Sequence, residues 1–80
     1  MKKYIKIYLN HFDYTINDFI PCEICGARAV DIHHINGRLG ENANNIENLM
    51  ALCRHCHTLA HNELMSKKQL QYLHNEYLKI

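Results

Sequence analysis

Four cysteines stand in two closely spaced pairs, and their spacing is typical of a metal site. Two residues separate Cys22 from Cys25, and two residues separate Cys53 from Cys56. A C-x2-C turn lets both thiolates of a pair face one ion, and four thiolates form the closed tetrahedral site of structural zinc. A chain of 80 residues also buries too little apolar surface to be very stable by packing alone. The cysteines therefore predict one structural zinc site.

Disulfide bonds are the other use of four cysteines. They persist in oxidising compartments, whereas C-x2-C pairs in a reducing compartment more often bind metal. The apolar stretch from Tyr4 to Leu9 is short, contains Lys6 and has no small-residue cleavage site after it, unlike a secretory signal. No apolar run approaches the roughly 18 residues of a membrane span. We therefore expect a cytoplasmic protein whose cysteines bind zinc.

Four histidines lie between and after the cysteine pairs, and a four-cysteine zinc site does not need them. His33 and His34 are adjacent, while His57 and His61 are four residues apart and would share one face of a helix. Imidazole binds divalent ions and transfers protons near neutral pH, because its unperturbed pKa is about 6.5. These histidines therefore indicate chemistry. The remaining histidines lack this pattern and are expected at the surface or in packing: His11, His55 and His74.

The segments that carry these residues predict a strand, a loop, a second strand and a helix. Ala29 to Ile35 is β-branched and partly alternating, as in a strand. Asn36 to Asn45 is dense in glycine and asparagine, which predicts a loop. Ile46 to Leu52 is mostly apolar and predicts a short return strand. A helix should begin near the second cysteine pair and carry His57 and His61.

Two further helices are expected near the ends of the chain. Lys3 to Phe12 fits both a strand and a helical period, and we favour the helix. Ser66 and Gln69 have the spacing of a capping box, which predicts a helix over about residues 66–79. Apolar residues recur along it at intervals of three and four, so we expect it to pack on the zinc core: Leu70, Leu73 and Tyr77.

The order of these motifs resembles the HNH endonucleases, in their zinc-knuckle branch with two flanking C-x2-C pairs. The resemblance spans Cys22 to His61 and includes the Asp31-Ile32-His33-His34-Ile35 segment and Asn48-Leu49. It implies the ββα-metal fold, a two-stranded hairpin followed by a helix. We therefore expect an α+β fold in which a small ββα-metal domain is held by a four-cysteine structural zinc and ends in an amphipathic helix. Residues 1–80 would form a single domain, with the N-terminal segment 1–21 packed on the motif.

The resemblance also implies roles for single residues. His34 takes the place of the general base, and Asn48 takes the place whose amide ties down the hairpin loop and so holds that base. The ligands of a catalytic divalent metal would be His33, His57 and His61. Such a site hydrolyses phosphodiester bonds, because the base generates the nucleophile and the metal stabilises the leaving oxygen.

The identity of the catalytic metal is left open between several ions. Several HNH branches have an aspartate and an asparagine as oxygen ligands, which suit magnesium, whereas this chain has imidazoles at both places. Imidazole prefers borderline ions, so Mn²⁺, Co²⁺, Ni²⁺ or Zn²⁺ should support activity at least as well as Mg²⁺. The second metal is left open among these five ions. Asp31 could hydrogen-bond a ligating imidazole, and a solvated carboxylate at a strand end explains it equally well.

Together these features predict a metal-dependent DNA endonuclease. The formal net charge of +1 provides no strong basic field, so DNA would be held locally, mainly through its backbone. A protein partner could then supply specificity, and many small HNH proteins of this kind belong to phages or mobile elements. The alternative is a non-catalytic zinc module that binds nucleic acid or protein. A nuclease that recognises modified DNA would differ only in its substrate.

Overall fold

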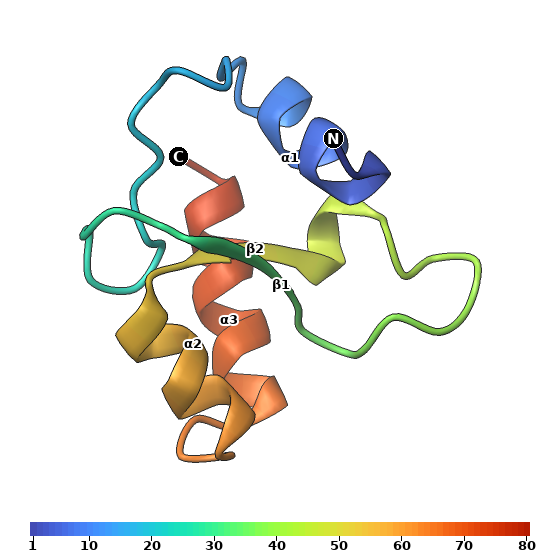
Figure 1. Cartoon of the computed structure of the whole chain (residues 1–80). Coiled ribbons are helices and arrows are strands. Elements are labelled where there is room, and N and C mark those ends of the chain that lie inside the picture. The colour runs from blue at the N-terminus through green and yellow to red at the C-terminus, as the bar shows by residue number, and fades with distance from the viewer.

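A two-stranded antiparallel hairpin lies at the centre of the protein, between α1 on one side and α2 on the other (Figure 1). The structure is a computed structural model that describes residues 1–80. Its fold is α+β, as predicted. The elements follow the order α1 (Lys3–His11), β1 (Asp31–His34), η1 (Ile46–Asn48), β2 (Leu49–Leu52), α2 (Arg54–His61) and α3 (Lys67–Leu78). None of these helices is long and apolar enough to cross a membrane.

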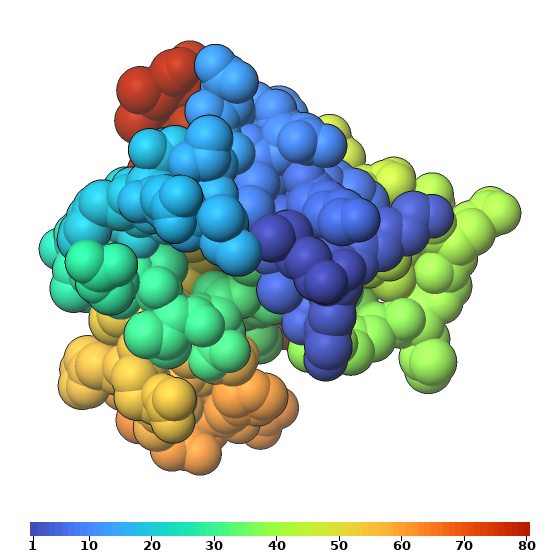
Figure 2. Space-filling model, turned by 45° about the horizontal axis from the view of Figure 1, so that its top comes forward, coloured from blue at the N-terminus to red at the C-terminus, as the bar shows by residue number.

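The hairpin is shorter than the sequence predicts. In its register Asp31 pairs with Leu52 and His34 pairs with Leu49. The sequence predicts a first strand that starts at Ala29, but the Ala29 backbone N–H turns away to the Ile20 carbonyl at 2.8 Å. The long loop between the strands projects from the body of the protein beside α1 (Figure 2).

The predicted return strand over Ile46 to Leu52 is wrong in its first three residues, which form the 3-10 helix η1. The Asn48 N–H donates to the Asn45 carbonyl at 2.9 Å, a bond that closes a turn and is incompatible with a strand ladder. This turn directs the Asn48 side chain inward.

The strand β2 is buried on both faces, which explains why Leu49 to Leu52 is uninterrupted and apolar. Side chains alternate along a strand, so its residues divide between two clusters. Leu49 and Ala51 pack with Tyr8 of α1. Met50 and Leu52 pack with the cysteines and with Leu70 of α3, so this face of the sheet and the cysteine cluster share one core.

The C-terminal helix begins where its sequence predicts. Ser66 and Gln69 form both bonds of a capping box, which satisfies backbone donors at the start of α3. Leu70 and Leu73 pack on the cysteine-containing cluster. Tyr77 packs on Phe12 after α1, with ring centroids 5.7 Å apart, so α3 also closes against the N-terminal part of the chain.

A buried carboxylate in the first cysteine pair links the surrounding elements. Glu23 accepts hydrogen bonds from the Tyr8 hydroxyl and from the Ala51 N–H, and its other oxygen lies 2.6 Å from His74 Nδ1. His74 is 0% exposed, and its Nε2 lies 2.7 Å from the Ile46 carbonyl. Both partners of the His74 ring are acceptors, so both ring nitrogens donate and the imidazole is cationic. Burial lowers the pKa of His74, but the hydrogen bond and charge of Glu23 outweigh it and raise the pKa.

Candidate metal centres and catalytic site

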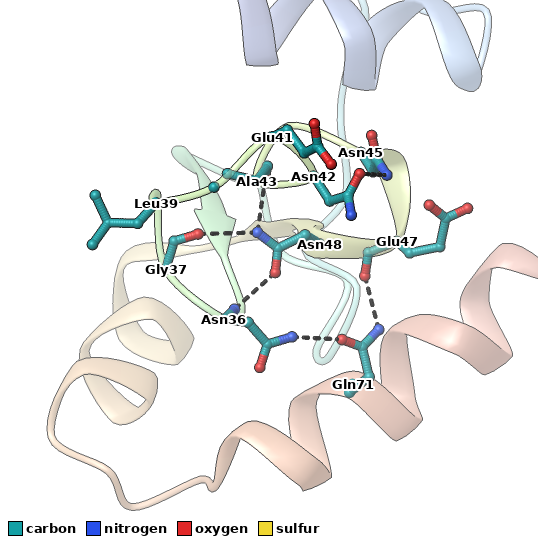
Figure 3. A pocket seen from close by; sticks show the side chains of 11 residues that line it. Asn36, Gly37, Leu39, Glu41, Asn42, Ala43, Asn45, Glu47, Asn48 and Gln71 are labelled. Atoms are coloured by element: carbon teal, nitrogen blue, oxygen red, sulfur yellow. Dashed lines mark hydrogen bonds between the residues drawn. The ribbon is translucent and has the colours of Figure 1, made fainter.

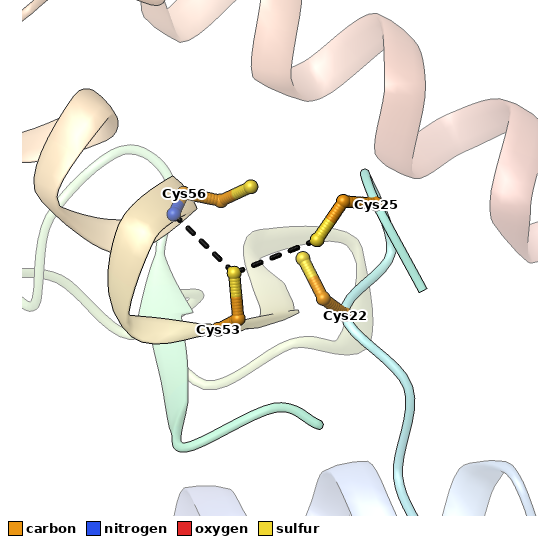
Figure 4. Close-up of side chains that lie close together, drawn as sticks. All are labelled: Cys22, Cys25, Cys53 and Cys56. Atoms are coloured by element: carbon orange, nitrogen blue, oxygen red, sulfur yellow. Dashed lines mark hydrogen bonds between the residues drawn. The ribbon is translucent and has the colours of Figure 1, made fainter. Parts of the chain in front are cut away.

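The four cysteines meet at one point, with their sulfurs turned toward one another (Figure 4). Cys22 and Cys25 lie at the turn that precedes β1. Cys53 is the N-cap of α2, and Cys56 lies in the first turn of that helix. All four Sγ atoms lie within 4.8 Å of one another, and no disulfide forms. Zinc–sulfur bonds of about 2.3 Å in a tetrahedron place sulfurs ~3.8 Å apart. The Cys25–Cys53 separation of 3.6 Å therefore fits zinc.

The protonation of these thiols also favours a bound cation. Burial raises the pKa of Cys22, but backbone hydrogen bonds from Cys25, Cys53 and Ile24 lower it to about 7. Burial and the neighbouring thiols raise the pKa of Cys56. Backbone hydrogen bonds therefore favour the thiolate of Cys22, whereas burial and the neighbouring thiols favour the protonated form of Cys56. A divalent ion bound by all four sulfurs would favour the thiolate form of each.

A second cluster joins the hairpin to α2 and consists of three imidazoles. His33 lies on β1, and His57 and His61 lie one turn apart on α2. One ring nitrogen from each lies within 4.8 Å of the others. The ring centroids are 5.0 Å apart for His33 and His57, and 4.5 Å apart for His57 and His61. Three nitrogen ligands with open positions beyond them suit a catalytic divalent ion.

The surroundings keep this cluster ready to bind a cation. Burial, then the charges of His57 and His61, lower the pKa of His33 to about 4, so its imidazole is neutral at pH 7 and offers a lone pair. His57 Nδ1 lies 2.9 Å from a carboxylate oxygen of Asp31. This bond gives Asp31 a defined partner and orients the His57 ring, leaving Nε2 for a metal.

His34 occupies a different environment from its neighbour, because adjacent strand residues point to opposite faces. It is 7% exposed and packs edge-on against Tyr4, with ring centroids 4.6 Å apart. Its Nε2 lies 3.0 Å from the side-chain oxygen of Asn44. An amide oxygen accepts, so Nε2 carries the proton and Nδ1 carries the lone pair. That Nδ1 is buried and has no hydrogen-bond partner.

Asn48 is buried at the base of the hairpin loop and binds the loop at three points (Figure 3). Its Nδ2 donates to the carbonyl oxygens of Ala43 at 2.8 Å and Gly37 at 3.1 Å. Its Oδ1 accepts from the Asn36 N–H at 2.8 Å. Asn44, the partner of His34, lies within the loop that these bonds hold. The Asn48 amide therefore fixes the loop, and through Asn44 the loop fixes His34.

A family model described as HNH endonuclease matches residues 22–63. This segment is more than half of the 80-residue chain and includes both cysteine pairs and the whole hairpin. The chain belongs to the HNH endonuclease family. No curated protein and no solved structure gave a significant match to it.

A cleft of about 700 Å³ opens beside the histidines of this HNH domain. Three of the predicted site residues, His33, His34 and His61, line it, whereas His57 does not line it and contacts Asp31. The remaining lining comes from the end of β1, the end of α2 and the start of α3: Ile35, Gly37, Ala60, Glu63, Met65, Ser66, Lys67, Lys68 and Leu70.

Sequence reasoning missed two residues that contribute to this HNH site. Asn44 is one of several asparagines in a loop rich in them, and no spacing marks it as the partner of His34. Glu23 lies between two zinc-ligand candidates, and nothing in its sequence neighbourhood shows that its carboxylate is buried. A charged residue inside a tight C-x2-C turn was the only available signal.

Proposed function

We propose that this HNH protein is a metal-dependent DNA endonuclease that hydrolyses phosphodiester bonds, and that residues 1–80 act as a single domain. One observation carries the proposal. His34 lines the same cleft as His33 and His61, two members of the three-imidazole cluster, and its buried Nδ1 has no hydrogen-bond partner within the protein. A candidate proton acceptor and a candidate cation site thus lie beside one cleft.

In this proposal His34 is the general base, and substrate binding admits a water molecule to its Nδ1, which is buried in the free protein. This water transfers a proton to His34 Nδ1 as its oxygen forms a bond to phosphorus, and the bond from phosphorus to the leaving oxygen breaks. The hydrogen bond to Asn44 keeps the ring proton on Nε2 and keeps Nδ1 available. Asn48 holds the loop and so positions Asn44. Neither asparagine needs to contact the substrate.

The three-imidazole cluster would hold the catalytic metal, and the four cysteines would hold structural zinc. A divalent ion held by His33, His57 and His61 supplies positive charge to the phosphate and to the leaving oxygen. Since all three side chains are imidazoles, we expect Mn²⁺, Co²⁺, Ni²⁺ or Zn²⁺ to support cleavage at least as well as Mg²⁺. Asp31 would keep the His57 ring in its ligating orientation.

DNA would bind mainly through its backbone, because the net charge of +1 gives no field strong enough to attract it over the whole surface. Backbone contacts carry little sequence information. Sequence selectivity in this proposal therefore comes from a protein partner.

A plasmid assay tests the proposal. Protein that keeps its cysteine-bound zinc is freed of other metal with a weak chelator and then supplied separately with Mg²⁺, Mn²⁺, Co²⁺, Ni²⁺ and Zn²⁺. We expect nicked or linear plasmid only after a divalent ion is added, and two bound metals per chain when both sites are filled. Folded protein that binds one zinc and cuts with none of the ions would instead indicate a non-catalytic zinc module.

A further inference from the structure

Two lysines lie on the cleft beside the histidines and have no role in the site as described so far. Lys67 and Lys68 line the cleft together with His33, His34 and His61. Both lysines are exposed, and neither takes part in any of the three ion pairs of the protein. Their charges are therefore free to bind an anion in the cleft.

The position of these lysines in α3 is electrostatically unfavourable. Ser66 is the N-cap, so Lys67 and Lys68 are the first two residues of the helix. The N-terminus of a helix carries partial positive charge and favours acidic side chains, yet the first turn of α3 contains none. The capping box keeps the helix from starting elsewhere. A local arrangement that opposes stability in this way is expected where a residue has a function.

A second observation concerns His34, which lines the same cleft and has an unsatisfied polar atom. His34 is more than nine-tenths buried, and its Nδ1 has no hydrogen-bond partner within the protein. The one acidic side chain on the lining is that of Glu63, which is exposed at the turn after α2. The lining therefore combines one acid with two lysines and three histidines, one of which is His34.

We propose that Lys67 and Lys68 bind a DNA phosphate that neighbours the one cleaved at the histidines. This inference rests on the proposed nuclease function and adds the path of the substrate. The DNA backbone runs from the end of β1 and the end of α2 across the cleft to the first turn of α3. The partial positive charge of the helix N-terminus acts on the same phosphate as the two ammonium groups.

The test measures DNA binding rather than cleavage. In a His34→Ala background, which blocks proton transfer, a short fluorescein-labelled DNA duplex is titrated with the zinc-loaded protein, and its anisotropy is followed at several salt concentrations. Replacing both lysines, as Lys67→Ala with Lys68→Ala, should weaken binding by about tenfold or more and lower the slope of log K against log salt by about 2. Unchanged affinity and slope would overturn the proposal.

A matched control separates a local site from a general charge effect. Lys67→Glu with Lys68→Glu is compared with Lys2→Glu and Lys3→Glu, which make the same charge change at the start of α1 and lie off the cleft. The pair on α3 should lose much more affinity than the pair on α1. Equal losses would mean that only net charge matters, and that result would contradict the proposal.

Thermal unfolding provides the second readout. Because acidic residues suit a helix N-terminus, Lys67→Glu with Lys68→Glu should unfold at the same temperature as the parent protein or at a higher one, even though it binds DNA less well. Weak binding that accompanies a lower unfolding temperature would show a structural role and overturn the proposal.

The two proposals fail separately. Wild-type protein that cuts plasmid, with lysine variants that bind the duplex normally, would refute only the phosphate site. Absence of cleavage with every metal, with DNA binding that still depends on the two lysines, would refute only the nuclease and keep this anion site.

Discussion

His33 and His34 are neighbours in sequence, yet the structure gives their imidazoles different surroundings. His33 lies among two other imidazoles, and burial and their charges keep its pKa near 4. His34 lies on the other face of the strand, where Asn44 holds its proton on Nε2. The alternation of side chains along β1, and the end of that strand at His34, give the two imidazoles these separate surroundings, which suit the proposed metal ligand and the proposed base.

Asn48 allows a direct test of how the base is held. Asn48→Asp keeps the acceptor for the Asn36 N–H but removes both donors and sets a carboxylate against the carbonyl oxygens of Gly37 and Ala43. We expect unfolding free energy to fall by about 1–3 kcal/mol. Plasmid nicking should fall further, because the loop that carries Asn44 loses its anchor. Urea unfolding and a nicking time course measure the two effects.

The control for this change is Asn42→Asp in the same loop. Asn42 is exposed, and its side-chain oxygen accepts from Asn45, a role that a carboxylate retains. This variant should resemble wild type in both measurements. If Asn48→Asp also behaved as wild type, Asn48 would not support the base.

Among single residues, the sequence predicts those that are brought together by their spacing along the chain. The C-x2-C pairs and the one-turn spacing of His57 and His61 are local patterns, and the structure brings the side chains of each group together. Asn44 could not be predicted, because its contact with His34 depends on the path of a ten-residue region without periodicity. Neither could the burial of Glu23, which depends on three other elements.

Among the elements, the Glu23 and His74 pair connects the first cysteine turn to α3. Both side chains are fully buried and lie 2.6 Å apart. Removing one partner of a buried charge pair strongly destabilises a protein, because the other charge is left without compensation. The pair therefore fixes the position of α3 relative to the zinc core, in addition to the apolar contacts of Leu70.

The His74 pair predicts a pH dependence of stability. The pKa of His74 is raised in the folded protein, since the hydrogen bond and charge of Glu23 outweigh burial, and Glu47 adds to the effect. A group with a raised folded pKa stabilises fully below its unfolded pKa of about 6.5, and this contribution is lost as pH rises through the folded value. The free energy of unfolding of wild type should therefore exceed that of His74→Gln by a smaller amount as pH increases from neutrality.

Thermal unfolding of both proteins across this pH range, with zinc present, measures the difference. Taking the difference cancels effects of pH on zinc binding that both proteins share. If the difference in unfolding temperature between wild type and His74→Gln stayed constant or grew with increasing pH, that result would contradict a cationic His74.

The elements themselves are predictable where a strong local signal exists. The capping box at Ser66 marks the start of α3 to the residue, and α2 begins at the second cysteine pair as its pattern predicts. Ile46 at the start of this turn is apolar and stands directly before the apolar run Leu49 to Leu52, so the sequence predicts one strand over both. The burial of the Asn48 amide decides the outcome, and this is a tertiary effect that local sequence does not contain.

For the whole molecule, the cysteine cluster is expected to decide whether the chain folds. Cys53→Ala should leave the protein unfolded, and a strong chelator should unfold wild type, because structural zinc contributes on the order of 10 kcal/mol, comparable to the full stability of a small domain. Circular dichroism with and without chelator, followed by zinc addition, measures this. A folded and soluble Cys53→Ala protein would refute a structural role for the cluster.

The two clusters are coupled through α2. Cys53 and Cys56 hold the start of this helix, and His57 and His61 occupy its remaining turns. A zinc ion that fixes the first turn therefore also fixes the direction of both imidazoles toward His33. In this account the structural site positions the catalytic one.

Cleavage by His34→Ala tests the central claim most directly. Wild type and His34→Ala are loaded with the same metals, their metal content and folding are compared, and both are assayed on supercoiled plasmid. We predict that the variant folds and binds both metals but loses plasmid nicking almost completely, because the cluster of His33, His57 and His61 remains and only the proton acceptor is gone. Cleavage by folded His34→Ala at the wild-type rate would contradict the assignment of the base.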